Sequence, residues 1–353
     1  MGVKCWVSCI RRGAAVGWLV FGSLVGMACA EDVVVYATGR EGRGRGTARG
    51  IVVDFTGEHL VLRVADGREQ TIPASRVIEV RTTRAPEQVA GDGFVRARQY
   101  EKALERYPAA LRNEQRPWVR REIMAQCVRC WCELGQFERA ARGFLALVQS
   151  DPKTQFFHTI PLAWFPHQPS PAFRQQASAW LENRSSGVAR LLGASWLLST
   201  EGRAAAIGAL QELRVDRDAR VALLAEAQLW RTQVVRVKPQ DVERWRGVIA
   251  RMPERLRPGP YFVLGQALAA QGREESAALA FLRIPILYPE YGRLAAAALL
   301  SAGRELERIG QAQEAATLYQ EVVRDHGDAP AAAEAASRLE NLAKPAPVPR
   351  KAR

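Results

Sequence analysis

The sequence contains few of the residues that usually carry catalysis, and those it has are scattered. Four of its 353 residues are histidine, and none lies at metal-ligand spacing from another histidine or a carboxylate pair. There is no Gly-x-Ser-x-Gly elbow and no dinucleotide-binding fingerprint. We therefore expect no enzyme, no metal site and no cofactor. His158 and His167 flank a segment rich in proline and aromatic residues and could meet in space, but we interpret them as ordinary loop residues.

Cysteine is scarce beyond the first 30 residues. Three of the six cysteines precede residue 31, and the others are Cys127, Cys130 and Cys132 in one predicted helix. A zinc site needs a second cysteine pair or nearby histidines, which are missing. Cys127 lies on the apolar stripe of its helix, so we predict structural thiols. A redox pair at Cys130 remains an alternative.

Long apolar runs are also rare, but one occupies residues 14–27. It follows Lys4, Arg11 and Arg12, and the small residues Ala28-Cys29-Ala30 come directly after it. This order is typical of a secretory signal peptide, and the run is short for a membrane span. We predict cleavage after Ala30 and a periplasmic or secreted protein, with an uncleaved N-terminal membrane anchor as the alternative.

Lysine is nearly absent, with 6 Lys against 44 Arg, and the net charge is +13. Residues 1–30 carry +3, residues 31–84 carry +1 and the last ten carry +4, which leaves +5 for residues 85–343. Such a mildly basic body is not a phosphate-binding surface, so we expect no nucleic-acid partner. Residues 39–50 (GREGRGRGTARG) lack interleaved aromatics and a phosphate-loop lysine, and predict a flexible hairpin loop. Residues 344–353 predict a disordered basic tail.

Residues 31–84 have the two-residue period of β-strands. Asp66-Gly67 separates two apolar runs and predicts a hairpin turn. Five short strands in one small segment predict a β-barrel, which is similar in outline to SH3-like and Sm-like folds. The strand-like runs are residues 33–38, 51–54, 60–65, 70–72 and 77–82.

Helical periodicity follows to the end of the chain, and one hairpin pattern occurs twice at a displacement of 38 residues. In each copy an apolar stripe at i, i+3, i+4 and i+7 precedes a glycine that ends the helix. A second helix then begins with a small residue and places an aromatic residue one turn later, which predicts that Phe281 and Tyr319 are buried. The copies are Tyr261, Leu264, Gly265, Leu268, Gly272, Ala277, Phe281 and Pro289, and Leu299, Ala302, Gly303, Leu306, Gly310, Ala315, Tyr319 and Gly327.

This spacing resembles the tetratricopeptide repeat, whose usual period is about 34 residues. Longer units are similar to those of periplasmic repeat proteins such as the Tol–Pal coordinator. Two further copies fit residues 85–152, where Ala103 and Ala140 occupy the small position 37 residues apart. The resemblance implies a mainly α protein, an α-solenoid of helical hairpins preceded by the small all-β barrel.

The remaining helical part is less regular. Residues 153–260 predict degenerate repeats, and residues 155–173 are too rich in proline and aromatics to form one helix. Repeats and a capping helix are expected over residues 261–343. Individual helices are predicted at residues 172–183, 186–200, 203–213, 217–235, 239–251 and 329–343.

The resemblance implies a non-catalytic scaffold that binds a peptide or protein in the concave groove of its first helices. A row of guanidinium groups there suits an acidic or C-terminal peptide. Two alternatives are an envelope-assembly component that recognises peptidoglycan or polysaccharide through the barrel, and an enzyme built across the aromatic segment. The family spacing places these residues in the groove: Arg129, Glu133, Phe262, Gln266, Arg304 and Arg308.

Overall fold

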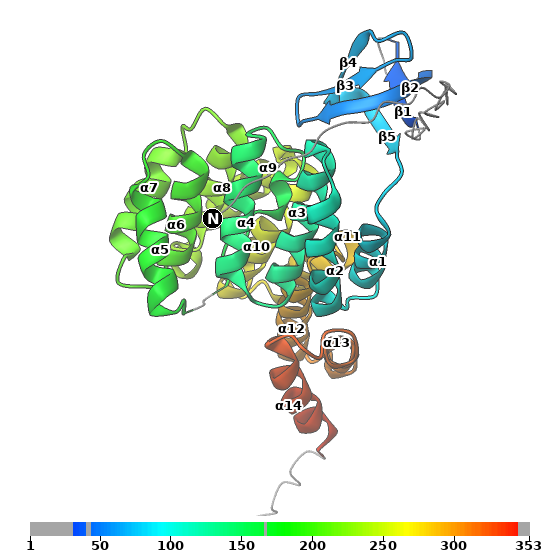
Figure 1. Ribbon diagram of the computed structural model, residues 1–353. Coiled ribbons are helices and arrows are strands. Elements are labelled where there is room, and N and C mark those ends of the chain that lie inside the picture. Colours follow the sequence, from blue (N-terminus) through cyan, green and yellow to red (C-terminus); the bar gives the residue numbers. More distant parts are fainter. Residues whose placement is uncertain (1–30, 40–43, 166–167, 345–353) are drawn as a thin grey trace, which may run out of the picture.

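The computed structural model describes residues 31–39, 44–165 and 168–344, where a small antiparallel sheet is followed by α-helices (Figure 1). The predicted signal peptide and the tail beyond residue 344 lie outside these residues. Within the described ranges, none of the helices combines the length and apolar character that crossing a bilayer requires. The described chain is thus mainly helical, with a five-stranded sheet near its N-terminal side.

The sheet has the strand order β4-β3-β2-β1-β5, and every neighbouring pair is antiparallel. Five strands were expected from the sequence, and five are present in the described residues. The predicted turn at Asp66-Gly67 joins β3 to β4, with a φ of 86° at Gly67. The strands are β1 (Asp32–Thr38), β2 (Gly44–Phe55), β3 (His59–Arg63), β4 (Glu69–Pro73) and β5 (Val77–Arg81), with the short helix η1 (Ala74–Arg76) before β5.

The prediction of a flexible loop over residues 39–50 is wrong for residues 44–50, which form the first half of β2. This half pairs with β1, from Thr38 opposite Gly44 to Asp32 opposite Gly50. Gly46 lies opposite Tyr36, and a Cβ on Gly46 would lie 2.8 Å from the Tyr36 ring. Glycine therefore lets the tyrosine ring cover the neighbouring strand, a cross-strand contact that local composition does not reveal.

Buried polar contacts attach the sheet to the first helices. The indole Nε1 of Trp118 donates to the backbone oxygen of Val52 at 3.3 Å. Arg121, 6% exposed, forms an ion pair with Asp54 and donates to the backbone oxygen of Phe55 at 3.2 Å. Apolar side chains of the sheet and of α1–α3 share one buried cluster. The sheet therefore packs against the helical body instead of standing as a separate unit.

The helices lie close to their predicted positions, and most consecutive helices pack side by side. Among the described residues of the aromatic segment, a short 3₁₀ turn is the only helical element before α5, which agrees with its proline content. The helices are α1 (Pro86–Arg96), α2 (Tyr100–Asn113), α3 (Pro117–Glu133), α4 (Phe137–Ser150), η2 (Phe157–Thr159), α5 (Pro171–Glu182), α6 (Gly187–Leu197), α7 (Arg203–Leu213), α8 (Ala219–Trp230), η3 (Val234–Arg236), α9 (Pro239–Arg251), η4 (Glu254–Leu256), α10 (Pro258–Ala270), α11 (Glu274–Leu287), α12 (Gly292–Arg308), α13 (Ala312–Asp325) and α14 (Ala331–Ala343).

A close contact between a glycine and an aromatic ring, like that between Gly46 and Tyr36 in the sheet, also holds several helical hairpins together. A Cβ on Gly303 would lie 2.4 Å from the ring of Tyr319, and Gly265 is equally close-packed against Phe281. The predicted burial of both rings is confirmed, with Phe281 2% and Tyr319 0% exposed. Between the paired helices, the backbone turns at a residue with positive φ, as at Gly310 (80°). The spacing noted in the sequence therefore corresponds to one recurring packing arrangement.

We expect Gly303→Ala to destabilise the protein by about 1–3 kcal/mol, since an added methyl group must displace the Tyr319 ring or separate α12 from α13. The matched control is Gly208→Ala in α7, where nothing lies within 4 Å of the added Cβ. That change should stabilise the protein by about 0.5–1 kcal/mol through helix propensity. Urea denaturation of both variants measures the two effects, and effects of the same sign would contradict this packing.

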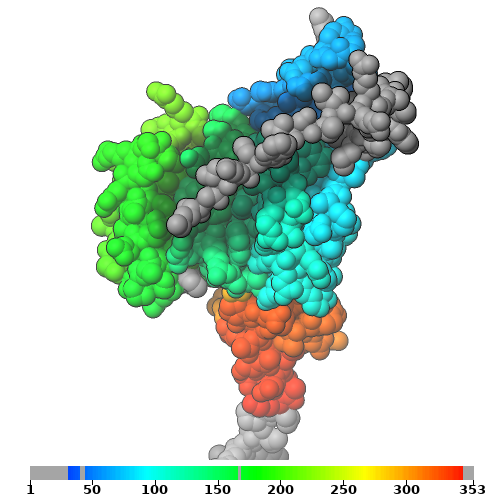
Figure 2. Space-filling view, in the orientation of Figure 1, coloured from blue at the N-terminus to red at the C-terminus, as the bar shows by residue number. Residues whose placement is uncertain are grey.

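The helical path returns to its own start, because α12 contacts α3. At the same junction, Arg98 donates to the backbone oxygen of Asp325 at 3.1 Å. In Figure 1, α5–α7 lie on one side of the body and α1 and α2 on the other. The sheet and the last helices project from opposite ends of the body in Figure 2. The contact between α3 and α12 brings together residues that bound one side of an internal cavity.

Candidate ligand cavity

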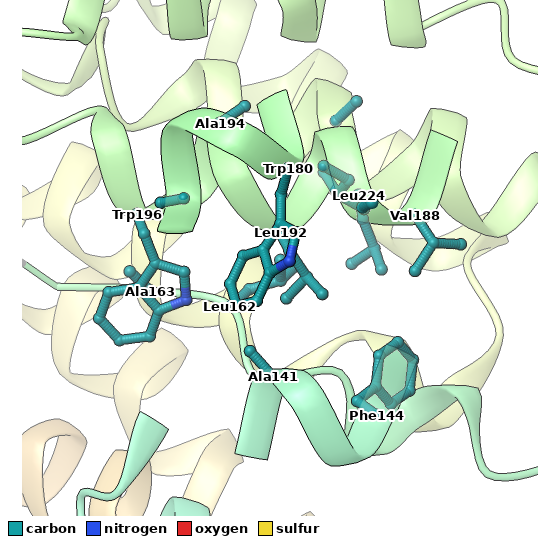
Figure 3. Packing of buried hydrophobic residues seen from close by; sticks show 14 of the residues in the cluster. Ala141, Phe144, Leu162, Ala163, Trp180, Val188, Leu192, Ala194, Trp196 and Leu224 are labelled. Atoms are coloured by element: carbon teal, nitrogen blue, oxygen red, sulfur yellow. The ribbon is translucent and has the colours of Figure 1, made fainter. Parts of the chain in front are cut away.

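The aromatic segment passes through the interior of the helical body. The indole Nε1 of Trp196 donates to Pro161 O at 2.9 Å, and Ser195 Oγ accepts from Ala163 N at 2.9 Å. Gln228 of α8 donates to Ala163 O at 3.2 Å. Side chains of α6 and α8 thus satisfy the backbone of a buried non-helical segment, as burial of such a segment requires. Figure 3 shows Leu162 and Ala163 among side chains of α4, α5, α6 and α8.

A cavity of about 420 Å³ lies beside this segment. Its volume is within the range of roughly 300–1,000 Å³ found for small-ligand pockets. Arg255 lines the cavity and is exposed, so the cavity reaches the surface beside it. Most of the wall is apolar or aromatic, and it includes Phe137, Phe156, Ile160, Leu162, Trp164, Phe165, Trp196, Leu256, Tyr291 and Leu294.

Glu133, at the C-terminal end of α3, contributes a carboxylate to the cavity wall. It accepts a hydrogen bond from the backbone N of Arg293 at 3.0 Å, and so caps the N-terminus of α12. Arg293 Nη1 in turn donates to the backbone oxygen of Glu133 at 3.2 Å. Burial raises the pKa of Glu133 to about 7, against the opposing effects of the Arg293 backbone N–H and the Arg129 charge. Glu133 therefore changes charge near neutral pH.

Two side chains of α3 that line the cavity each contain one buried polar atom without a protein partner. Among the described residues, the buried Nε of Arg129 and the buried Oε1 of Gln126 make no hydrogen bond. Both residues line the cavity, and they lie three positions apart on one helix face. A buried polar atom without a partner costs free energy. Both atoms are inaccessible from the cavity, so other atoms of these two side chains form its wall.

His158 lines the same cavity but is poorly suited to acid–base catalysis near neutral pH. Burial lowers its pKa to about 4, and the charges of Arg255 and Arg129 act in the same direction. Its Nδ1 lies 3.3 Å from the backbone oxygen of Gln155. The Tyr291 hydroxyl donates to the backbone oxygens of His158 (3.2 Å) and Arg255 (3.0 Å), which holds the wall in place. His167, the suggested partner of His158, lies outside the described residues.

The three cysteines of α3 are free thiols of low reactivity. Cys127 is 4% and Cys130 0% exposed, and burial raises the pKa of each to about 12. Burial also raises the pKa of Cys132, which lines the cavity. Such thiols are protonated at neutral pH and are weak nucleophiles. In the part of the chain that the structure describes, no group of three or more His, Cys, Asp or Glu side chains could hold a metal ion.

Arg129 and Glu133 are the two predicted groove residues that line the cavity. Phe262 is 3% exposed, and its ring centroid lies 6.2 Å from that of Phe165. Its side chain is therefore part of the apolar core and is closed to a ligand. Gln266 lies on the same helix, half-buried and away from the cavity lining.

Arg304 and Arg308 lie far along α12 and bind acidic side chains of the protein itself. Arg304 Nε donates to Glu334 of α14 at 2.9 Å. Arg308 donates to Glu305 one turn earlier at 2.6 Å. Because α14 packs on α12, Arg304 faces the last helix instead of an open groove, whereas Arg308 pairs within α12 itself. The structure thus does not bring the six predicted residues together.

Several cavity residues were not predicted from the sequence. Tyr291 and Arg293 lie on either side of Gly292, the first residue of α12, and follow Pro289, which the repeat pattern places at the end of a hairpin. That pattern was a usable signal for their position at a helix start, but it does not indicate what they face. Arg255 lies in a short connection where no periodicity applies.

The repeat spacing and the cavity are the features available for assigning a function, since no protein-family model and no curated protein sequence matches this chain.

Proposed function

We propose that this chain is an exported, non-catalytic binding protein built from tetratricopeptide-like hairpins, and that it binds part of a polypeptide partner in the cavity. The order of charged, apolar and small residues over 1–30 supports export. The recurring glycine–aromatic contact between paired helices supports the repeat family. The strand order, with β5 beside β1, supports a small SH3-like barrel at the N-terminal side.

The cavity is the observation that carries this proposal. It combines an apolar, aromatic wall with the side chains of two arginines, Arg129 and Arg255. Aromatic walls bind apolar groups, and an arginine side chain in such a wall orients an anionic or carbonyl group. The volume accommodates a side chain or a chain end, not a folded domain. His158, which also lines the cavity, is neutral at pH 7, because burial and the charges of Arg255 and Arg129 lower its pKa to about 4.

A photo-crosslinking amino acid at Thr159 tests this function. Thr159 lines the cavity, so the probe should crosslink to one short peptide segment when the full chain is expressed in its own cells. The matched control is Val215, which is 87% exposed outside the cavity and should give no defined product. Mass spectrometry of the crosslinked peptides identifies the segment.

A variant with a filled cavity distinguishes a peptide bound in the cavity from one that is crosslinked by chance. Cys132 lines the cavity, so Cys132→Trp should occupy it and abolish the crosslink from Thr159. Crosslinking that persists in the filled variant, or products that are glycans instead of peptides, would refute peptide binding at this cavity.

A further inference from the structure

The outer face of α11 carries a row of apolar side chains that are open to solvent. Leu279, Ile286 and Leu287 are 60%, 71% and 53% exposed. They lie seven and eight residues apart, about two turns, so they share one side of the helix. Single exposed apolar residues are ordinary on a protein surface, whereas several on one side of a helix indicate a contact with another surface.

The helices that occupy the same place in other hairpins lack this row. α13 and α4 can be aligned with α11 on the small residue of each hairpin, Ala315, Ala140 and Ala277. At the three apolar positions of α11 both have polar or charged side chains, which are Thr317, Arg324 and Asp325 in α13, and Arg142, Gln149 and Ser150 in α4. The apolar row on α11 is therefore not a requirement of the hairpin.

Two charged side chains lie on the same face. Glu275 and Arg283 stand four residues before and four residues after Leu279, and all three are exposed, so they form one ridge along the helix. Arg283 donates to the Tyr261 hydroxyl at 3.2 Å. In the part of the chain that the structure describes, neither Glu275 nor Arg283 has an oppositely charged partner. Because the acid and the base are equally far from Leu279, this ridge is complementary to a copy of itself that runs in the opposite direction.

We propose that this face of α11 binds the same face of a second copy of the chain, with the two helices antiparallel about Leu279. A two-fold axis at Leu279 places Glu275 of each copy opposite Arg283 of the partner subunit. Ile286, seven residues after Leu279, then lies over Gly272 of the partner subunit, seven residues before it. Gly272 is exposed and has no side chain that could obstruct the isoleucine.

The charges favour a second copy over a lipid surface. Glu274 and Glu275 begin α11, and anionic headgroups would repel both. A second copy instead supplies an arginine for each Glu275 and an acid for each Arg283, so every charge that the contact desolvates gains a partner. Only one helix of each copy takes part, and such a small contact predicts a dimer that dissociates on dilution.

This inference goes beyond the proposed function, because the cavity wall contains none of the residues of the α11 face. Crosslinking from Thr159 should therefore be the same in a variant that no longer dimerises as in the unchanged protein. Loss of the dimer and loss of peptide binding in the cavity can thus be observed separately.

Sedimentation equilibrium of the purified protein tests the proposal. The mean mass should rise from that of one chain toward twice that value as the concentration increases. Leu279→Arg should weaken the association by about tenfold or more, since it removes the central apolar contact and brings two positive charges together. The matched control is Val215→Arg, also at a largely exposed position but outside α11, which should leave the association unchanged. Thermal unfolding checks that both variants are folded.

An exchange of charges tests the antiparallel arrangement. Glu275→Arg should weaken the dimer, because the ridge then carries two positive charges. Adding Arg283→Glu to the same chain should restore the dimer, since the ridge again has one acid and one base about Leu279. On mild oxidation, Leu279→Cys should form a disulfide between two copies beyond any that the unchanged protein forms. Leu287→Cys should not, because it lies eight residues from the axis.

A protein that stays monomeric up to about 1 mM would overturn the proposal. A dimer that Leu279→Arg leaves intact would also overturn it, as would a folded double charge exchange that stays monomeric. If a photo-crosslinking amino acid at position 279 of a monomeric protein captured a different protein, the face would be assigned to that protein and the second copy would be excluded.

Discussion

Phe281→Ala is expected to lower the free energy of unfolding by about 3–5 kcal/mol, the usual cost of emptying a buried aromatic site. The Phe281 ring is 2% exposed and lies between α10 and α11. It packs directly on the backbone at Gly265, and its centroid lies 5.4 Å from that of Phe262. Because Gly265 has no side chain, it cannot fill the space that the missing Phe281 ring would leave. Urea denaturation followed by circular dichroism measures the loss.

Arg273→Ala is the matched control for this substitution. Arg273 lies in the turn that precedes α11, and its contact with Glu243 is a surface ion pair at 3.8 Å. Such pairs contribute about 0–1 kcal/mol, so the control should change stability little. Similar losses from both substitutions would mean that Phe281 does not hold this hairpin together.

Asp54→Ala is expected to destabilise the protein by about 3 kcal/mol, the lower end of the range for breaking a buried ion pair. The Arg121 side chain is only 6% exposed, and the substitution removes its counter-charge at the contact between the sheet and α3. The lower end applies because the Asp54 side chain is itself 35% exposed, so water already screens part of the pair. Denaturation at pH 7 gives the magnitude, and limited proteolysis should show easier cleavage between β5 and α1.

The control for Asp54 is Glu79→Ala, also in the sheet. Glu79 pairs with Arg81 on an exposed surface, where both side chains are well solvated, so its removal should have little effect. If Asp54→Ala were as mild as Glu79→Ala, the ion pair with Arg121 would not fasten the sheet to the helical body.

Short-range patterns in the sequence predicted the elements well. The five strand-like runs and the helices at residues 203–213 and 239–251 are where the periodicity placed them. The burial of Phe281 and Tyr319 also followed from spacing, since the hairpin that buries each ring spans fewer than twenty residues from its partner glycine. Such contacts can be predicted because the two residues that form them are close in the sequence.

The predicted groove residues show which features short-range patterns did not predict. Family spacing placed Arg304 on an open inner face, but α14 returns over α12 and binds it through Glu334. Arg129 and Glu133 line a cavity because α12 meets α3 and the aromatic segment enters the body. None of these encounters depends on residues close in sequence, so no local period could reveal them.

By itself, the sequence determined which residues form helices and strands and which aromatic rings are buried within a hairpin. Only the tertiary structure decided that residues 44–50 join the sheet, that the helical path returns to α3, and that Arg129 and Glu133 of α3 line a cavity. The physical reason is range. Periodicity and turn chemistry act over a few residues, whereas Glu133 caps a helix that begins about 160 residues later in the chain.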